Sequence, residues 1–200
     1  MATPSFFHQI HRSYIDVPIT PEEGIDTGAF LEATESLIKL FDSMGSAFAS
    51  VKADMQGNVT KIRTKFLSDP INLSTLQSIV LAEKSDKKKT ATEALLWLKR
   101  ALEFTSAGLR RSLDQPTEEL SVSFSKAYEV TLAQFHSFLI RPVFALAMKA
   151  CPLRKDFYAK LAGSESPEDL VKQMSEWLSA LEHLIGILIK FYVAGNYDKL

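Results

Sequence analysis

The sequence lacks several motifs that mark particular enzyme classes, zinc sites and disulfide-bonded secreted domains. Only one of its 200 residues is a cysteine, Cys151, so no intrachain disulfide can form and no cysteine cluster indicates structural zinc. It contains no G-x-S-x-G nucleophile elbow, no zinc-binding H-E-x-x-H pair and no glycine-rich phosphate loop. We therefore expect no metal site, no cofactor and a reducing, cytoplasmic location.

Charge and long apolar runs are also scarce. The formal net charge is −1, which gives no electrostatic basis for non-specific binding to nucleic acid. The N-terminus has no apolar run of signal-peptide length, and Arg141 and Lys190 interrupt the longest apolar stretches before membrane-spanning length. We expect a soluble protein that is neither secreted nor embedded in a membrane, and that contacts a bilayer only transiently.

What the sequence does have is a helical pattern over most of its length. Hydrophobic residues make up 46% of the chain, while eight glycines and eight prolines leave little room for a turn-rich β fold. Residues 1–26 read as an extended N-terminal arm, and residues 27–200 as one helical domain. Periodicity and break signals predict helices over 27–44, 48–67, 73–83, 90–113, 117–150, 155–161, 167–174 and 175–193, with a bend at Pro142. The prediction is an all-α, single-domain, two-layer bundle of about eight helices.

Three polar residues form a ridge on the second predicted helix. Asp54, Asn58 and Lys61 stand at i, i+4 and i+7 and share an arc of about 60° that borders the apolar face of the helix. An acid, an amide and an ammonium together suit a ligand that carries several hydroxyls. The same spacing is also common on an ordinary solvated helix, and the residues alone do not decide between these readings.

Two aromatic side chains are further candidates. Trp97 shares a helix face with small residues, so the indole either packs in the core or lies open to a ring-shaped ligand. His136 falls on the apolar face of the helix predicted over 117–150, with Leu132, Leu139, Ile140, Val143 and Ala147. A buried histidine needs a hydrogen-bond partner, which is either another residue or a ligand.

Several segments together resemble the glycolipid transfer protein family. The strings are VKADMQGNVTKI (Val51–Ile62), ALLWLKRALEF (Ala94–Phe104), KAYEVTLAQFHSFLI (Lys126–Ile140), TGAFLEA (Thr27–Ala33) and GNY (Gly195–Tyr197), in the family's order and spacing. The resemblance covers nearly the whole chain. It implies an eight-helix, two-layer fold and a monomer that binds a glycosphingolipid, with the sugar in a surface cleft and the ceramide in a hydrophobic tunnel.

The resemblance also implies a role for each candidate residue. Asp54, Asn58, Lys61 and Trp97 would bind the sugar, His136 and Asp54 the ceramide amide, and Tyr197 would be a further headgroup contact. The implied tunnel lining is Phe41, Phe48, Val51, Phe104, Leu132, Phe144, Ala147 and Met148. Transient membrane contact would involve Phe138, where a tryptophan is common in the family, and Lys149, where a tyrosine occurs.

Three other functions compete with glycolipid transfer. A ceramide-1-phosphate carrier would need more cations than Lys61, with Arg100 the nearest further candidate. A hydrolase could pair Asp54 with His136, but no nucleophile stands in a recognisable setting. A lipid sensor that reports occupancy to a partner fits the same residues, so the sequence does not distinguish it from a carrier.

Overall fold

The computed structural model describes residues 3–199, and in these residues every regular element is helical. The α-helices are α1 (Phe6–Gln9), α2 (Thr27–Leu40), α3 (Ala49–Ser68), α4 (Leu76–Ala82), α5 (Thr90–Asp114), α6 (Leu120–Val130), α7 (Arg141–Lys149), α8 (Arg154–Ala162) and α9 (Pro167–Gly195). Five short 3₁₀ turns and two isolated β-bridges complete the described chain. The all-α prediction is confirmed.

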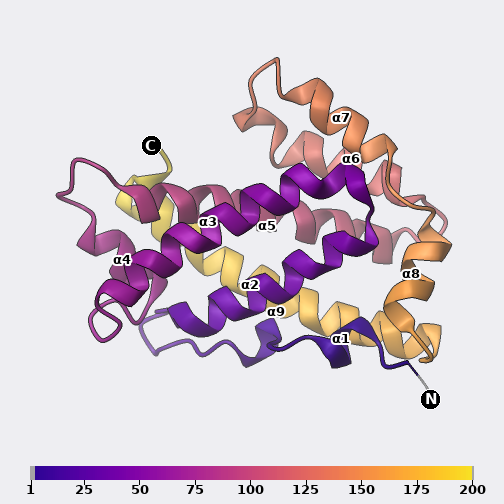
Figure 1. The fold of residues 1–200 in the computed structure, drawn as a ribbon, viewed down its shortest axis with the longest axis horizontal. Coiled ribbons are helices and arrows are strands. Elements are labelled where there is room, and N and C mark those ends of the chain that lie inside the picture. Colours follow the sequence, from indigo (N-terminus) through magenta and orange to yellow (C-terminus); the bar gives the residue numbers. More distant parts are fainter. Residues whose placement is uncertain (1–2, 200) are drawn as a thin grey trace.

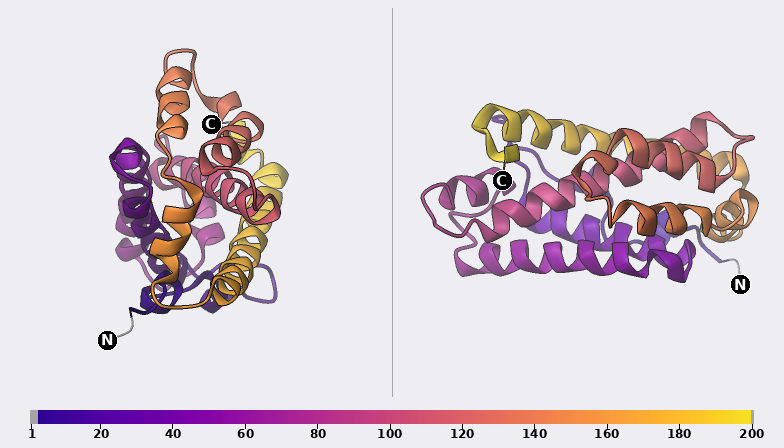
Figure 2. Two further views of the ribbon diagram at one scale, coloured as in Figure 1. Left: turned by 90° about the vertical axis from the view of Figure 1, so that its right-hand side faces the viewer. Right: turned by 90° about the horizontal axis from the view of Figure 1, so that it is seen from above.

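The longest helices pack in two layers around α5. Helices α2 and α3 lie side by side in one layer, and α5 contacts α3 on one side and α6 and α9 on the other (Figures 1 and 2). The core between the layers holds large buried side chains such as Phe30, Phe104, Phe124 and Trp177. Because α5 is central, its residues reach both the core and the cavity described below.

Gly108 allows α5 and α6 to approach closely. A Cβ at this position would lie 2.7 Å from the ring of Phe124 on α6, closer than real carbon contacts allow. Trp97, three turns earlier on the same helix, lines the cavity described below and is partly exposed. The small residues on this face therefore serve tight packing at one end of α5 and open space at the other.

The single helix predicted over 117–150 is wrong. Helix α6 ends at Val130, a 3₁₀ turn spans Ala133–Phe135, and α7 begins at Arg141. Pro142 lies in the first turn of α7, where its missing N–H costs nothing, and so it starts a helix instead of bending one. His136 consequently sits in the connection and is half-buried, and three of its predicted face partners, Leu139, Ile140 and Val143, are exposed.

The two helices predicted over 167–174 and 175–193 are one helix, α9. No glycine or proline lies near the predicted break at residues 174 and 175, and the side chain of Ser166 caps the start of the helix by accepting a hydrogen bond from the Asp169 N–H at 3.0 Å. By length and composition α9 is long and apolar enough to cross a membrane. From the sequence we expected no apolar stretch of that length. Its most apolar side chains recur every three or four residues and are buried in the core, the pattern of a central helix in a helical domain.

Candidate functional site

A cavity of about 490 Å³ opens between α3, the first half of α5 and the segment from α6 to α7. This volume is within the range of roughly 300–1,000 Å³ that ligand pockets occupy. The residues that line it are Ser50, Val51, Asp54, Asn58, Lys61, Thr90, Glu93, Ala94, Trp97, Ala101, Leu132, His136, Ile140 and Phe144. The five residues predicted to bind the sugar and the ceramide amide are among them, whereas Tyr197, predicted as a further headgroup contact, is not.

The polar ridge of α3 forms one wall of this cavity. The Asn58 side chain is 4% exposed and its Nδ2 donates to Asp54 Oδ2 at 3.2 Å, while Asp54 and Lys61 are exposed. In the described part of the chain Lys61 forms no ion pair. The burial of Asn58 argues against an ordinary solvated face, because a buried amide needs its donors and acceptors satisfied. The wall thus offers an acceptor, an amide and a free cation.

Trp97 and His136 face each other across α5 and the α6–α7 connection. Their rings are nearly parallel, at 20° with centroids 6.2 Å apart, and the His136 ring lies 4.5 Å from that of Phe144. The guanidinium of Arg100 lies 4.9 Å from the indole and 3.7 Å from the ring of Phe135, and it does not line the cavity. These contacts fix the indole at the cavity without burying it.

One ring nitrogen of His136 already has a partner. Nδ1 lies 3.0 Å from the hydroxyl of Tyr128, which leaves Nε2 for a ligand. Burial lowers the pKa of His136 below its usual value, although the nearby Asp54 carboxylate opposes this fall. The imidazole is therefore neutral near pH 7. In the tautomer in which Tyr128 donates to Nδ1, Nε2 carries the proton and can donate to a carbonyl oxygen.

The predicted tunnel residues fall into two groups. Val51, Leu132 and Phe144 line the cavity. The other five are buried in the packed core and do not line it: Phe41, Phe48, Phe104, Ala147 and Met148. Phe41 stacks on Phe48 at 5.8 Å, and Phe104 meets Phe144 edge-on at 6.5 Å. The cavity therefore ends against an aromatic cluster and does not continue as an open channel.

The remaining predicted contacts lie outside the cavity. Tyr197 is 8% exposed and packs against Phe191 and Tyr192. Phe138 is 80% exposed, in the turn before α7, and Lys149 is exposed at the end of that helix. The cavity lining includes none of these three residues.

Sequence reasoning missed several residues of the site. Ser50, Thr90 and Glu93 line the cavity, and Glu93 stands one turn before Trp97 on the same face of α5, so helical spacing alone could have identified it. Tyr128 gave no such signal. It approaches His136 only because α6 ends between them and the chain turns back.

A helical domain whose cavity is polar and hydrogen-bonding on one wall and apolar on the other defines a binder of amphiphilic molecules. The chain belongs to the glycolipid transfer protein family, whose model matches residues 25–163. It is 50% identical over 189 residues to the glycolipid transfer protein of Aureobasidium melanogenum, covering 94% of this chain and 92% of that protein. It is 34% identical over 208 residues to human pleckstrin homology domain-containing family A member 8, of whose length it spans only 40%.

Solved structures share the fold over nearly the full chain. HET-C2, a fungal glycolipid transfer protein, matches with a TM-score of 0.89 and 46% identity, over 94% of this chain and 96% of that one. A structure that addresses how FAPP2 selects simple glycosphingolipids using the same fold matches with a TM-score of 0.86 and 32% identity, over 97% of each chain.

Proposed function

We propose that this protein binds one neutral glycosphingolipid and carries it between membranes without changing it chemically. The cavity is the main support, because it joins a hydrogen-bonding wall and an exposed indole to apolar side chains. The similar proteins support the same function. The relative from Aureobasidium melanogenum and HET-C2 are glycolipid transfer proteins, and the FAPP2 structure concerns the selection of simple glycosphingolipids.

In this proposal the sugar rests on Trp97. A pyranose has C–H groups on one face that suit an indole, and its rim hydroxyls need both donors and acceptors. Asp54 accepts, Lys61 donates and Asn58 does both. Each such bond contributes about 0.5–1.5 kcal/mol, or roughly 1.5–3 when charged, while a buried group left without a partner costs more. That cost is what would reject lipids without the sugar.

The ceramide occupies the apolar part of the cavity. His136 Nε2 donates to the amide carbonyl, and Asp54 accepts from the amide N–H. Two chains with about 30 methylenes would cost on the order of 25 kcal/mol if fully exposed to water, so the protein must enclose them. Phe41, Phe48, Phe104, Ala147 and Met148 pack without a channel, and we propose that they move apart as the chains enter.

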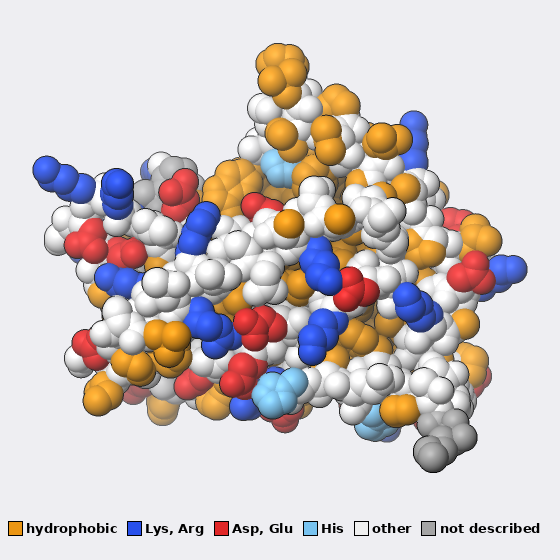
Figure 3. Space-filling view, in the orientation of Figure 1, with side chains coloured by type: hydrophobic (Ala, Val, Ile, Leu, Met, Phe, Trp, Pro, Cys, Tyr) orange, Lys and Arg blue, Asp and Glu red, His pale blue; other side chains and the backbone are white. Residues whose placement is uncertain are grey.

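Transient membrane contact would occur through the surface of the 138–146 segment. Phe138, Leu139, Val143 and Leu146 are between 55% and 80% exposed, and Figure 3 shows hydrophobic side chains gathered over α7 and the turn before it, at the top of the molecule. Patches of this kind mark interaction sites. Lys149, at the end of α7, adds a positive charge. The carrier would act in the cytoplasm as a monomer.

The charges in the cavity favour a sugar over a phosphate. Asp54 and Glu93 provide two carboxylates against the single ammonium of Lys61. Arg100 does not supply a second cation, because its guanidinium is enclosed by Trp97 and Phe135 and donates to the Asp198 carbonyl at 3.4 Å. A ceramide-1-phosphate headgroup would therefore meet net negative charge.

Transfer between vesicles tests the proposal. Catalytic amounts of protein should move labelled glucosylceramide to acceptor vesicles and leave it intact, while ceramide-1-phosphate moves far more slowly. Glu93→Gln should raise transfer of a sulfated glycolipid relative to the neutral one. Faster transfer of ceramide-1-phosphate, or a hydrolysis product from glucosylceramide, would contradict the proposal. Binding without transfer would indicate a sensor.

A further inference from the structure

A cluster of lysines lies in the connection between α4 and α5, directly before a residue that lines the cavity. Lys84, Lys87 and Lys88 are exposed and Lys89 is half-buried. None of the four forms an ion pair in the described part of the chain. Asp86, the one acid of the segment, points to Lys65 on α3 at 3.9 Å. Residues 84–89 thus carry a charge of +3 in a chain whose net charge is −1.

The carboxylate of Glu83 holds this segment against the start of α5. It is 4% exposed and accepts hydrogen bonds from the N–H groups of Ala91 and Thr92, at 3.1 and 2.7 Å, and from the Thr92 hydroxyl at 2.8 Å. An acid at a helix N-terminus both satisfies unpaired N–H groups and complements the helix dipole. The lysines that follow are therefore presented at a defined place.

That place is beside the mouth of the cavity. Thr90 and Glu93, in the first turn of α5, line the cavity, and the lysines come immediately before them. On its other side the cavity is lined by His136 and Ile140, next to the exposed apolar surface of the 138–146 segment. In Figure 3 the basic side chains project at the upper left and the apolar ones at the top.

We infer that residues 84–89 form a docking surface for an anionic lipid membrane. The inference rests on the proposed function, because it assumes that the cavity loads at a bilayer. Basic segments near an anionic surface gain about 1 kcal/mol per lysine, equivalent to about fivefold in affinity, and salt screens this attraction. Apolar contact on one side of the mouth and cationic contact on the other would orient the cavity toward the lipid.

Binding to vesicles that contain no glycolipid tests the inference. Affinity is compared for phosphatidylcholine vesicles and for vesicles in which a fifth of that lipid is replaced by phosphatidylserine. The variant is Lys84→Gln/Lys87→Gln/Lys88→Gln, and the control is Lys39→Gln/Lys155→Gln/Lys172→Gln, which removes equal charge from exposed positions on α2, α8 and α9. Circular dichroism establishes that both are folded.

The loop variant should lose on the order of 10- to 100-fold in affinity for the anionic vesicles at low salt. Its affinity for neutral vesicles and its transfer of glucosylceramide between them should not change, and high salt should remove the difference from wild type. Equal losses in the loop variant and the control, or no loss in either, would overturn the inference. Failure of the wild type to transfer glucosylceramide between neutral vesicles would instead defeat the proposed function.

Discussion

Asp54 is the residue on which the proposed lipid complex depends most. It accepts a hydrogen bond from Asn58 and lies close enough to His136 to affect its pKa. We propose that it accepts from a sugar hydroxyl and from the ceramide amide at once. Asp54→Val accepts nothing and would leave two donors unpaired, at about 1–3 kcal/mol each, so transfer should fall by on the order of 100-fold or more.

Asp54→Asn should transfer at an intermediate rate, because its amide oxygen still accepts but carries no charge. Apo Asp54→Asn should unfold at a temperature close to that of wild type, since Asp54 is exposed, forms no ion pair in the described structure, and is replaced by an amide whose oxygen can still accept from Asn58. Apo Asp54→Val removes this acceptor from the buried Asn58 and should unfold at a somewhat lower temperature. Vesicle transfer and thermal melting measure these effects. Transfer by Asp54→Val near the wild-type rate, with helical circular dichroism intact, would remove Asp54 from the site.

The two tryptophans of the chain form a matched pair for testing the stacking platform. Trp97 lines the cavity and is partly exposed, whereas Trp177 is 1% exposed and packs against Phe7 and Tyr14. Trp97→Ala should reduce transfer by on the order of tenfold or more with little change in melting temperature, because the ring contributes contact to the ligand rather than to the core. Trp177→Ala should instead cost about 3–5 kcal/mol of stability.

Melting in the absence of lipid and transfer at low temperature measure the two effects separately. If Trp97→Ala melts as early as Trp177→Ala but transfers normally in the cold, then its indole is a core residue and the proposed sugar platform is wrong.

At the scale of elements, the break between α6 and α7 creates the site. Because the chain leaves the helix after Val130, His136 turns back to Tyr128 while Phe138 points into solvent. Phe138→Ala should lower affinity for vesicles by on the order of tenfold, since burying a Phe side chain is worth about 1.5–3 kcal/mol. Affinity for a short-chain, soluble glycolipid should stay the same, because Phe138 does not line the cavity.

Leu67→Ala is the control for this element. Leu67 is 62% exposed near the end of α3, so its loss removes a comparable apolar group far from the 138–146 segment. Equal losses of vesicle binding and soluble-ligand binding in Phe138→Ala would place Phe138 in the pocket and contradict the assignment.

The helical periodicity predicted α2, α3 and α5 well, because each has a continuous apolar stripe bounded by caps and breakers. It failed between residues 117 and 150. The apolar pattern runs on past Val130 there, although Leu139, Val143 and Leu146 are exposed and not buried. Spacing reports which residues are apolar and does not report whether the fold buries them.

The candidate site shows the same limit. Asp54, Asn58 and Lys61 could be grouped from spacing, because they share one helix. Their convergence with Trp97 and His136 on one cavity needed the resemblance, since it depends on how α3, α5 and the α6–α7 connection pack. The apolar spacing likewise does not distinguish between a Phe104 that lines a tunnel and a Phe104 that packs in the core.

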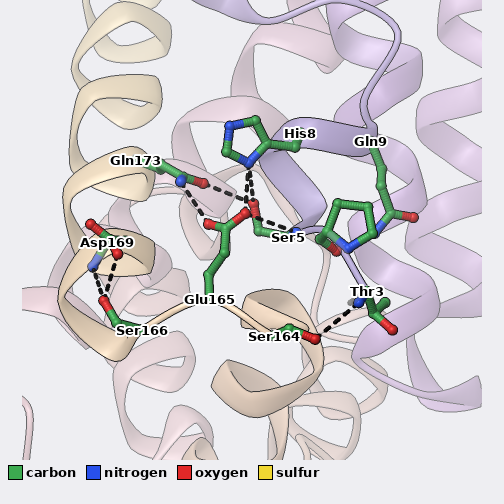
Figure 4. A network of polar contacts seen from close by, with 10 residues as sticks. Thr3, Ser5, His8, Gln9, Ser164, Glu165, Ser166, Asp169 and Gln173 are labelled. Carbon is green, nitrogen blue, oxygen red and sulfur yellow. Dashed lines mark hydrogen bonds and ion pairs between the residues drawn. The ribbon is translucent and has the colours of Figure 1, made fainter. Parts of the chain in front are cut away.

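At the scale of the whole molecule, the N-terminal arm is tied to the beginning of α9. Ser164 N–H donates to the Thr3 carbonyl at 2.8 Å, and a Cβ at Gly163, whose φ is +60°, would lie 2.4 Å from that carbonyl. Figure 4 shows the polar contacts that follow: Glu165 Oε1 lies 2.6 Å from His8 Nδ1 and accepts from the Ser5 N–H at 3.1 Å. These contacts thus hold the N-terminal arm against the outer surface of the helical domain.

Because of Glu165, the stability that these contacts give to the folded protein should depend on pH. Burial acts to raise the pKa of its carboxyl, but hydrogen bonds from His8, Ser5 and Gln173 outweigh burial and hold the pKa at about 2, below its ordinary 4.5. A carboxyl with a lowered pKa stabilises the folded state at pH values above 4.5, and this contribution is lost as the pH falls toward 2. Glu165→Gln should therefore melt at a lower temperature than wild type at pH 7, and the gap should narrow below pH 4.5.

Glu176→Gln, an exposed control on α9, should melt as wild type does at every pH. Melting curves between pH 7 and pH 2 test this, and a gap for Glu165→Gln that stays constant over that range would show that its charge does not hold the arm.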